Sequence, residues 1–183
     1  MLRALVDRAM QGDEEAFASL VRSVGDRCMA IAYRILRDID LAEDAVQTSF
    51  VTAWRQLRTL RDADRFEAWL HRLLVNACYA EARRRRPPTL NVVDLEPAST
   101  WADEYLAIHD RDQLERGFQR LPAEQRAVLV FHHYLGMTMP EVAEHLAIPL
   151  GTVKSRMHYA TIALRAAIEA DDRTTSHAKE RPA

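Results

Sequence analysis

Apolar residues recur every three or four positions along most of this chain, in stretches that proline or glycine usually ends. This period indicates amphipathic helices, each burying one face. The 183 residues include only five glycines and seven prolines, which is few for a turn-rich β fold. With 48% hydrophobic residues the chain can build cores. The sequence therefore predicts an all-α protein.

Local signals set the expected helix boundaries in the first half. Residues 2–10 form a short helix, and Asp13 is expected to N-cap a long helix over 14–36. Asp40 begins the next helix, with Glu43 as its capping-box partner. Its predicted inward stripe includes Trp54, which we expect in the core together with Trp69 of the following helix.

A proline pair, Pro87 and Pro88, ends the helix predicted over 66–86, because proline donates no backbone hydrogen bond and restricts the preceding residue. Three prolines and no helical period mark the segment that follows. The prediction is two small helical domains, 1–87 and 103–170, joined by a flexible linker over 88–102, with a disordered polar tail over 171–183.

Charge is segregated along a chain whose net charge is only −2. Residues 65–86 carry six arginines against two glutamates, whereas 87–115 carry seven acidic residues against one arginine. Such blocks indicate different partners for different segments. A free-standing nucleic-acid binder is usually basic overall, so weak affinity for DNA by the chain alone is expected.

The two cysteines, Cys28 and Cys78, lie in apolar helical surroundings without a CxxC pair, so we expect free buried thiols. The first residues carry charge throughout and lack the apolar core of a signal peptide, and no apolar run is long enough for a membrane span. A cytoplasmic protein without cofactor is the expectation.

A helix-turn-helix pattern lies near the C-terminus. A short helix over 140–146 is followed by a corner at 147–149 and a second helix over 150–168. On this second helix Val153, Met157 and Ala160 share an inward stripe. The outward residues Lys154, Ser155, His158 and Tyr159 are placed to contact DNA in a major groove, and Thr152 with the helix-start amides is placed to hold a phosphate. The alternative is a solvated face, since many such corners bind no nucleic acid.

Two segments of the first domain are candidate interfaces. The helix over 66–86 combines Asn76, an amide able to contact a base edge, with a terminal arginine cluster that suits phosphates. The stretch "DLAEDAVQTSF" offers Asp40, Glu43 and Asp44 to a basic protein partner. Solvated helix surfaces remain the alternative for both segments.

Together and in this order, "DLAEDAVQTSFVTAW", "RFEAWLHRLLVNACYAEARRRR" and "LPAEQRAVLVFHHYLGMTMPEVAEHLAIPLGTVKSRMHYATIALR" resemble the bacterial RNA polymerase sigma factors of the extracytoplasmic-function (ECF) group. The similarity covers about residues 5–168. It implies a transcription initiation factor that binds core RNA polymerase and promoter DNA, is no enzyme, and is usually held by an anti-sigma factor. The helix over 123–135 would lie beside the β flap of polymerase.

The resemblance also assigns roles to residues of this chain. The residues expected to contact the −35 promoter element are Thr152, Lys154, Ser155, Arg156, His158 and Tyr159. The residues expected to contact the −10 element are Asn76, Arg83, Arg84, Arg85 and Arg86. The residues expected to bind the β′ clamp helices are Asp40, Glu43, Asp44, Gln47 and Phe50. Thr48 stands where the family usually has Glu, Tyr159 where Arg is frequent, and an Asp usual near Tyr79 is missing.

Two other classes compete with this interpretation. A stand-alone transcriptional repressor explains the helix-turn-helix, but it leaves the arginine block and the acidic helix without a role and normally needs a dimer and a palindromic site. A metal enzyme has candidate ligands in His132, His133, Glu141 and His145, but the first two face different sides of a helix and no HExxH motif is present.

Overall fold

A computed structural model of the chain describes residues 2–85 and 115–179, and it describes the side chains in these ranges except for 168 and 170–179. All regular elements in these ranges are helical, which confirms the all-α prediction. The predicted linker over 88–102, the expected domain start at residue 103 and Arg86 lie outside the described residues. No described helix is long and apolar enough to cross a membrane.

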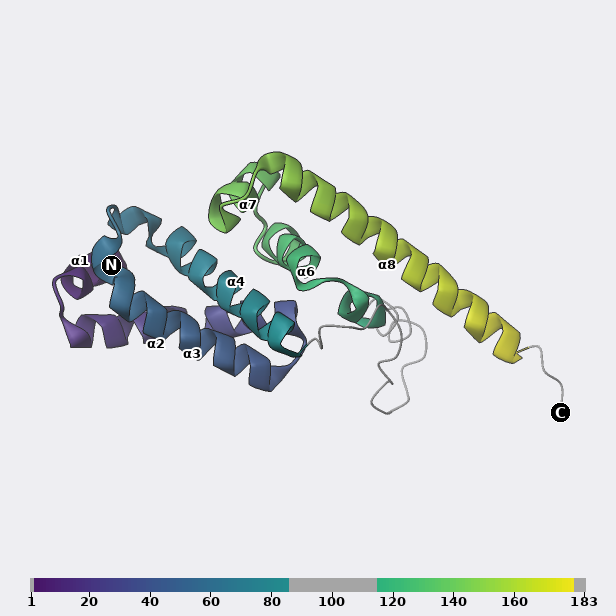
Figure 1. The fold of residues 1–183 in the computed structure, drawn as a ribbon, viewed down its shortest axis with the longest axis horizontal. Coiled ribbons are helices and arrows are strands. Elements are labelled where there is room, and N and C mark those ends of the chain that lie inside the picture. The colour runs from purple at the N-terminus through teal and green to yellow at the C-terminus, as the bar shows by residue number, and fades with distance from the viewer. Residues whose placement is uncertain (1, 86–114, 180–183) are drawn as a thin grey trace.

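The N-terminal half is a bundle of four helices (Figure 1): α1 (Leu2–Met10), α2 (Glu14–Leu36), α3 (Ile39–Gln56) and α4 (Phe66–Arg85). Two short 3-10 turns, Leu57–Thr59 and Ala63–Arg65, connect α3 to α4. Helices α2, α3 and α4 pack against one another. Their shared core includes Leu20, Ile31, Phe66 and Leu70, each at most 2% exposed.

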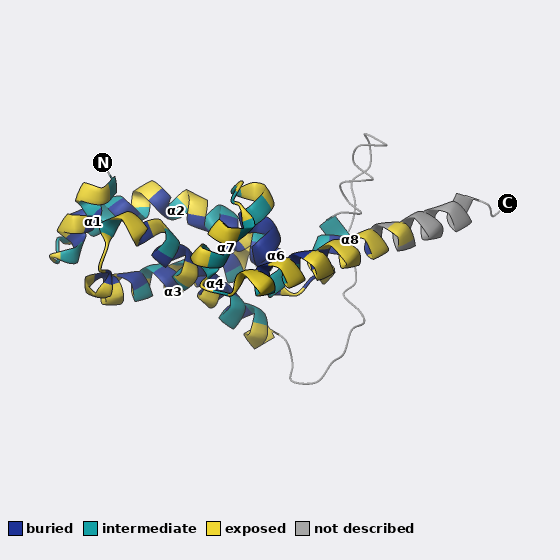
Figure 2. Cartoon of the chain, turned by 90° about the horizontal axis from the view of Figure 1, so that it is seen from above, coloured by how far each residue is buried: buried dark blue, intermediate teal, exposed yellow. Residues whose placement is uncertain are grey.

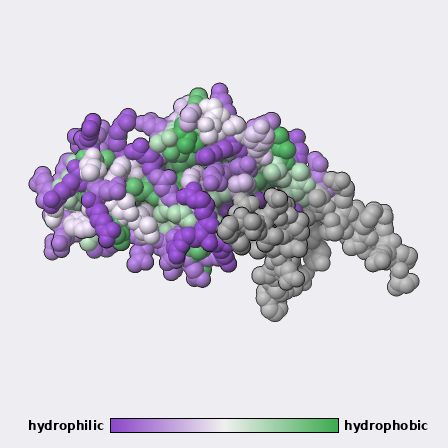
Figure 3. Space-filling view, in the orientation of Figure 1, coloured by the Kyte–Doolittle hydropathy of each residue, from purple (hydrophilic) through white to green (hydrophobic). Residues whose placement is uncertain are grey.

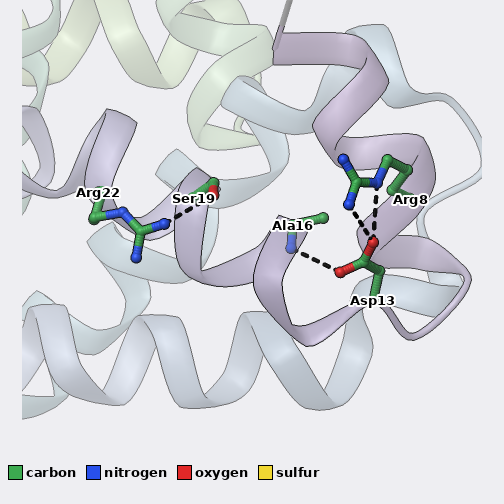
Figure 4. A network of polar contacts seen from close by, with 5 residues as sticks. All are labelled: Arg8, Asp13, Ala16, Ser19 and Arg22. Carbon is green, nitrogen blue, oxygen red and sulfur yellow. Dashed lines mark hydrogen bonds and ion pairs between the residues drawn. The ribbon is translucent and has the colours of Figure 1, made fainter.

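The start of α2 follows the sequence prediction (Figure 4). The carboxylate of Asp13 accepts a hydrogen bond from the Ala16 amide at 2.9 Å, which satisfies one of the amides left open at a helix start. Arg8 donates to the other Asp13 oxygen from Nε and Nη2, at 2.9 and 2.6 Å. This one side chain therefore caps α2 and fixes the end of α1 against it.

The start of α3 differs from the prediction. Its N-cap is Asp38, whose carboxylate accepts from the Leu41 amide at 3.1 Å, so the capping box expected from Asp40 and Glu43 is wrong. Both side chains are exposed instead. The preceding residue, Arg37, ends α2 with a φ of 59°, and this sharp reversal brings Asp38 to the helix start.

The buried face of α3 is also rotated from the expected stripe. Its buried residues are small, namely Ala42, Ala45, Ser49 and Ala53, because α3 lies against both α2 and α4 and small side chains permit close approach. Trp54 is 39% exposed and packs with one side on Phe17, with ring centroids 4.9 Å apart, so its core assignment is wrong. Trp69, at 9% exposure, is in the core as predicted.

The described part of the C-terminal unit comprises a helical stretch over 115–120 followed by α6 (Ala123–Leu129), α7 (Met139–Leu146) and α8 (Leu150–Lys179). The helix predicted over 123–135 is interrupted, because Val130–Tyr134 forms a π-helical turn directly after α6. One wider turn shifts the following side chains around the axis. As a result Phe131 is fully buried while Tyr134 is 46% exposed.

The helix-turn-helix is confirmed in α7 and α8. Thr138 and Glu141 form the predicted capping box at the start of α7. Ala147 ends α7 in the left-handed conformation, with φ 53°, and Pro149 follows before α8 begins. Helix α8 extends past residue 170 as far as Lys179. The two halves of the chain lie in contact, with α7 against α4 and α6 against both α2 and α4 (Figure 2).

Candidate DNA and polymerase interfaces

The outer face of α8 presents the side chains predicted for DNA recognition. Lys154, Ser155, His158 and Tyr159 are all exposed, and Tyr159 reaches 61% exposure. On the opposite face Val153, Met157 and Ala160 are buried, each at most 8% exposed. Exposed donors on the first turns of the second helix of such a motif suit base edges and phosphates in a major groove.

Arg156 is placed differently from its neighbours. It is half-buried and lies near Tyr79 of α4 in the other half of the chain, where its charge opposes the rise that burial causes in the pKa of Tyr79. It therefore faces the N-terminal bundle and not the exposed face. The Thr152 amide donates to the Pro149 carbonyl at 2.9 Å, so it is already bonded and not open to a phosphate.

The predicted −10 residues on α4 fall into two groups. Asn76 and Arg83 are exposed. Arg84 pairs with Glu81 at 3.0 Å on the same helix, and Arg85 pairs with Asp38 at the start of α3. Two of the three described arginines of the cluster thus have intramolecular partners, which DNA phosphates would have to replace or share.

The predicted polymerase residues of α3 lie on one side of the helix. Asp40, Glu43, Asp44 and Gln47 are exposed, and Phe50 is half-buried. Sequence reasoning missed two neighbours, Val51 and Trp54, which are 44% and 39% exposed. The surface is therefore acidic at one end and apolar at the other. The helical spacing of 40, 44, 47, 51 and 54 was the available signal.

Two histidines of the second unit, His132 and His145, bond to nearby carbonyls. His132 Nδ1 lies 2.6 Å from the Met137 carbonyl, and His145 Nδ1 lies 2.9 Å from the Glu141 carbonyl. These contacts fix the tautomer in which Nδ1 donates. Among the described residues no three or more His, Cys, Asp or Glu side chains gather as a metal site.

The described face seen in Figure 3 carries few large apolar areas. In the view of Figure 3 hydrophilic residues dominate the described face, and hydrophobic residues form small separate patches. The exposed large apolar side chains in the described ranges include Ile39, Val51, Tyr159 and Ile162.

Comparison with known proteins gives two family matches. Residues 20–87 match the model described as Sigma-70 region 2, and residues 111–164 match Sigma-70, region 4. The chain is 30% identical over 180 residues to the RNA polymerase sigma-H factor of Pseudomonas aeruginosa, covering 90% of this chain and 92% of that protein. It is 34% identical over 170 residues to the ECF RNA polymerase sigma factor SigL of Mycobacterium tuberculosis, covering 87% and 95%.

Solved structures agree with these matches. CnrH in complex with the cytosolic domain of CnrY is similar with a TM-score of 0.66 and 28% identity, over 93% of this chain and 98% of that one. The sigma factor RpoE of Bartonella quintana, solved with the anti-sigma factor NepR, shows the same fold at 23% identity and a TM-score of 0.56, over 85% and 98%. The chain therefore belongs to the ECF group of RNA polymerase sigma factors, non-enzymatic proteins that bind core polymerase and promoter DNA to start transcription at specific promoters.

Proposed function

We propose that the two halves of this sigma factor divide promoter recognition between them. The outer face of α8, with Lys154, Ser155, His158 and Tyr159, contacts the −35 element. Asn76 and the arginines at the end of α4 contact the −10 element. The observation that carries the proposal is the exposure of both polar faces, each backed by a buried apolar stripe.

Core polymerase would bind the exposed side of α3, at its β′ clamp helices. The acidic residues Asp40, Glu43 and Asp44 suit basic side chains of a partner, and the neighbouring Val51 and Trp54 offer apolar area that a protein interface can bury. Thr48, where the family usually has Glu, is also exposed and removes one charge from this surface. The second half would lie beside the β flap.

Linkage of two weak contacts explains how a chain with net charge −2 selects a promoter. When polymerase holds both halves along one duplex, the second contact becomes intramolecular and gains effective concentration. Phosphate contacts supply most sequence-independent affinity for DNA, and a chain with net charge −2 has no excess of basic residues to make them. The free factor is therefore expected to bind DNA weakly.

In vitro transcription with purified core polymerase tests this division. We expect Lys154→Ala and Ser155→Ala to reduce transcripts from promoters that depend on the −35 element by about tenfold, the effect of losing about 1.4 kcal/mol of contact. Polymerase binding, measured by gel filtration or fluorescence anisotropy, stays at the wild-type level. Arg22→Ala, exposed on α2 outside the proposed faces, serves as the control. Loss of polymerase binding by the α8 variants would contradict the proposal.

A regulatory protein partner is a further part of this proposal. The similar CnrH was solved with the cytosolic domain of CnrY, which supports a partner of that kind for this chain. Co-purification of tagged factor from its own cells, followed by transcription assays with the recovered partner, tests it. A bound protein that leaves transcription unchanged would argue against an anti-sigma role.

A further inference from the structure

The contact between the two halves contains a buried side chain, His71, whose aromatic partners belong to the other half. His71 lies on α4 and is 4% exposed. Its ring meets Phe131 edge-on with centroids 5.3 Å apart, and the ring of His145 lies 5.6 Å away. Phe131 and His145 belong to the C-terminal unit. The C-terminal unit thus contributes to the burial of His71.

Polar and aromatic contacts surround this centre. The guanidinium of Arg34 on α2 lies 3.7 Å from the ring centroid of Tyr134, within the usual range for a cation–π contact. Arg65 pairs with Glu144 of α7 at 3.1 Å, and Arg37 pairs with Glu115. Together with His71 these contacts join the C-terminal end of α2 and the start of α4 to the second unit.

Two features limit the stability of the contact between the units. Nδ1 of His71 is buried and has no hydrogen-bond partner among the described residues, and an unpaired buried polar atom costs free energy. The Arg65–Glu144 pair is largely exposed, and exposed ion pairs contribute little. The contact is therefore suited to form in the free chain and to open when a stronger partner competes.

We propose that the described arrangement is a closed, self-inhibited state of the free factor, held by the contact of His71 with Phe131 and His145. The inhibition rests on the function proposed above, because it follows from the distance between the two promoter elements. Their positions place them about 25 base pairs apart, which is about 85 Å of B-DNA. In the closed state α7 lies on α4, and α8 begins directly after the corner that follows α7. The two recognition faces then cannot reach both elements at once.

The position of Arg156 supports this inference independently. This predicted DNA-contacting residue is directed toward Tyr79 on α4, so closure withdraws it from the exposed face of α8. Opening would release Arg156 for DNA at the same time as it separates the units. The partner that opens the contact is then core polymerase, which binds both halves.

Reversible cross-linking tests the closed state. In the full chain, Arg34→Cys and Tyr134→Cys are combined and treated with a short bis-maleimide that contains a reducible bond. The native thiols react little, because Cys28 and Cys78 are at most 2% exposed and burial raises the pKa of each to about 12. We expect the free chain to cross-link within itself in high yield. A pair that remains unlinked would overturn the closed state.

The linked protein is then compared with the same protein after reduction, in transcription with core polymerase. We expect at least a tenfold loss of transcript when linked and full recovery on reduction. A linked pair within α2, Arg22→Cys with Asp26→Cys, is the matched control and should keep its activity. Equal activity of the linked and reduced forms would overturn self-inhibition. If even the wild-type factor starts no RNA, the proposed function fails, while the cross-linking yield still decides the closed state.

A second variant changes the contact without touching the linked sites. His145→Lys places a charge beside the buried His71 and should slow cross-linking of the pair several-fold. Thr161→Lys, at an exposed position on α8 in the same unit, should leave the rate unchanged. The same rate in both variants would show that the histidine contact does not hold the units together.

Discussion

At the scale of single residues, Ala147 has the most demanding backbone position of the DNA-binding unit. It adopts φ 53° and ψ 45° at the end of α7, a conformation in which its Cβ crowds the following carbonyl. Its amide donates to the Glu144 carbonyl at 3.2 Å, and the Ile148 amide donates to the Ala143 carbonyl at 3.1 Å. The corner is thus held by backbone hydrogen bonds that close the last turn of α7.

Glycine at this corner should stabilise the protein. Ala147→Gly removes the Cβ from a left-handed residue, and we expect the free energy of unfolding to rise by about 0.5–1 kcal/mol, the gain being reduced by the greater freedom of the unfolded chain. Thermal unfolding followed by circular dichroism measures it. Ala143→Gly, inside α7, is the control and should lower stability by about 1 kcal/mol. A lower Tm for Ala147→Gly would refute the strain argument.

Asn76 should act in promoter opening more than in binding. Its exposed amide on α4 is placed to hold an unstacked base, and extruding a base costs a few kcal/mol that such contacts offset. We expect Asn76→Ala to weaken permanganate reactivity of the melted strand by about tenfold while polymerase binding is unchanged. Arg72→Ala, exposed on the preceding turn, controls for loss of a surface side chain. Normal melting by Asn76→Ala would remove this residue from the proposed site.

At the scale of helices, Asp38 joins two elements through one carboxylate. It caps α3 through the Leu41 amide and pairs with Arg85 at the end of α4. The hydrogen bond from the Leu41 amide, followed by the contact with Arg85, lowers the pKa of Asp38 below its ordinary value of 3.8. The ionised form is therefore the one that stabilises the fold.

The cap and the charge of Asp38 can be separated by substitution. Asp38→Ala removes both and should lower the free energy of unfolding by about 1 kcal/mol at neutral pH. Asp38→Asn keeps a capping oxygen and loses the charge. Because the pKa is lower in the folded state, the advantage of wild type over Asp38→Asn is complete above about pH 4 and disappears as the pH falls below that value. Urea unfolding between pH 7 and 3 checks this, and a pH-independent difference would contradict it.

Helix starts were predictable where a local signal sufficed. Asp13 and the pair Thr138 and Glu141 cap their helices as expected, because capping depends on a few neighbouring residues. The start and face of α3 were not predictable, since two acidic residues near Ile39 offered alternative caps and its buried residues are small. The π-helical turn at Val130–Tyr134 has no local signal in the sequence, and its Phe131 is fully buried.

At the scale of the whole molecule, the sequence predicted the exposure of several residues in each candidate interface but not the contact between the halves. The exposed positions of Lys154 and Asn76 follow from helical period alone. The burial of His71 does not, because its partners Phe131 and His145 are far away in the sequence. Such long-range contacts are set by tertiary packing, which a period within one helix does not encode.

The closed arrangement should weaken in mild acid. Burial, together with the charges of His145 on α7 and Arg27 on α2, lowers the pKa of His71 to about 4 from an ordinary 6.5. Arg27 itself pairs with Glu67 of α4 at 3.6 Å. The closed arrangement favours the neutral form of the His71 ring. The contribution of His71 to the stability of the closed arrangement is therefore complete above about pH 6.5 and is lost as the pH falls toward 4.

The range between pH 7.5 and 5 isolates this effect, since most carboxylates stay ionised there. We expect the cross-linking yield of the Arg34→Cys, Tyr134→Cys pair, corrected for thiol reactivity with the α2 control pair, to fall with pH in the wild-type background. His71→Phe should make the yield less dependent on pH. A yield that falls equally in both backgrounds would assign the transition to other groups.

The two thiols have a consequence for signalling. Burial raises the pKa of each of Cys28 and Cys78 to about 12, so both stay protonated at pH 7, and both are shielded from solutes. The sequence contains no other cysteine. Oxidants such as peroxide attack thiolates, so this factor is insulated from them in its folded form. A cell that couples this regulon to thiol oxidation would need a sensor other than these two buried cysteines.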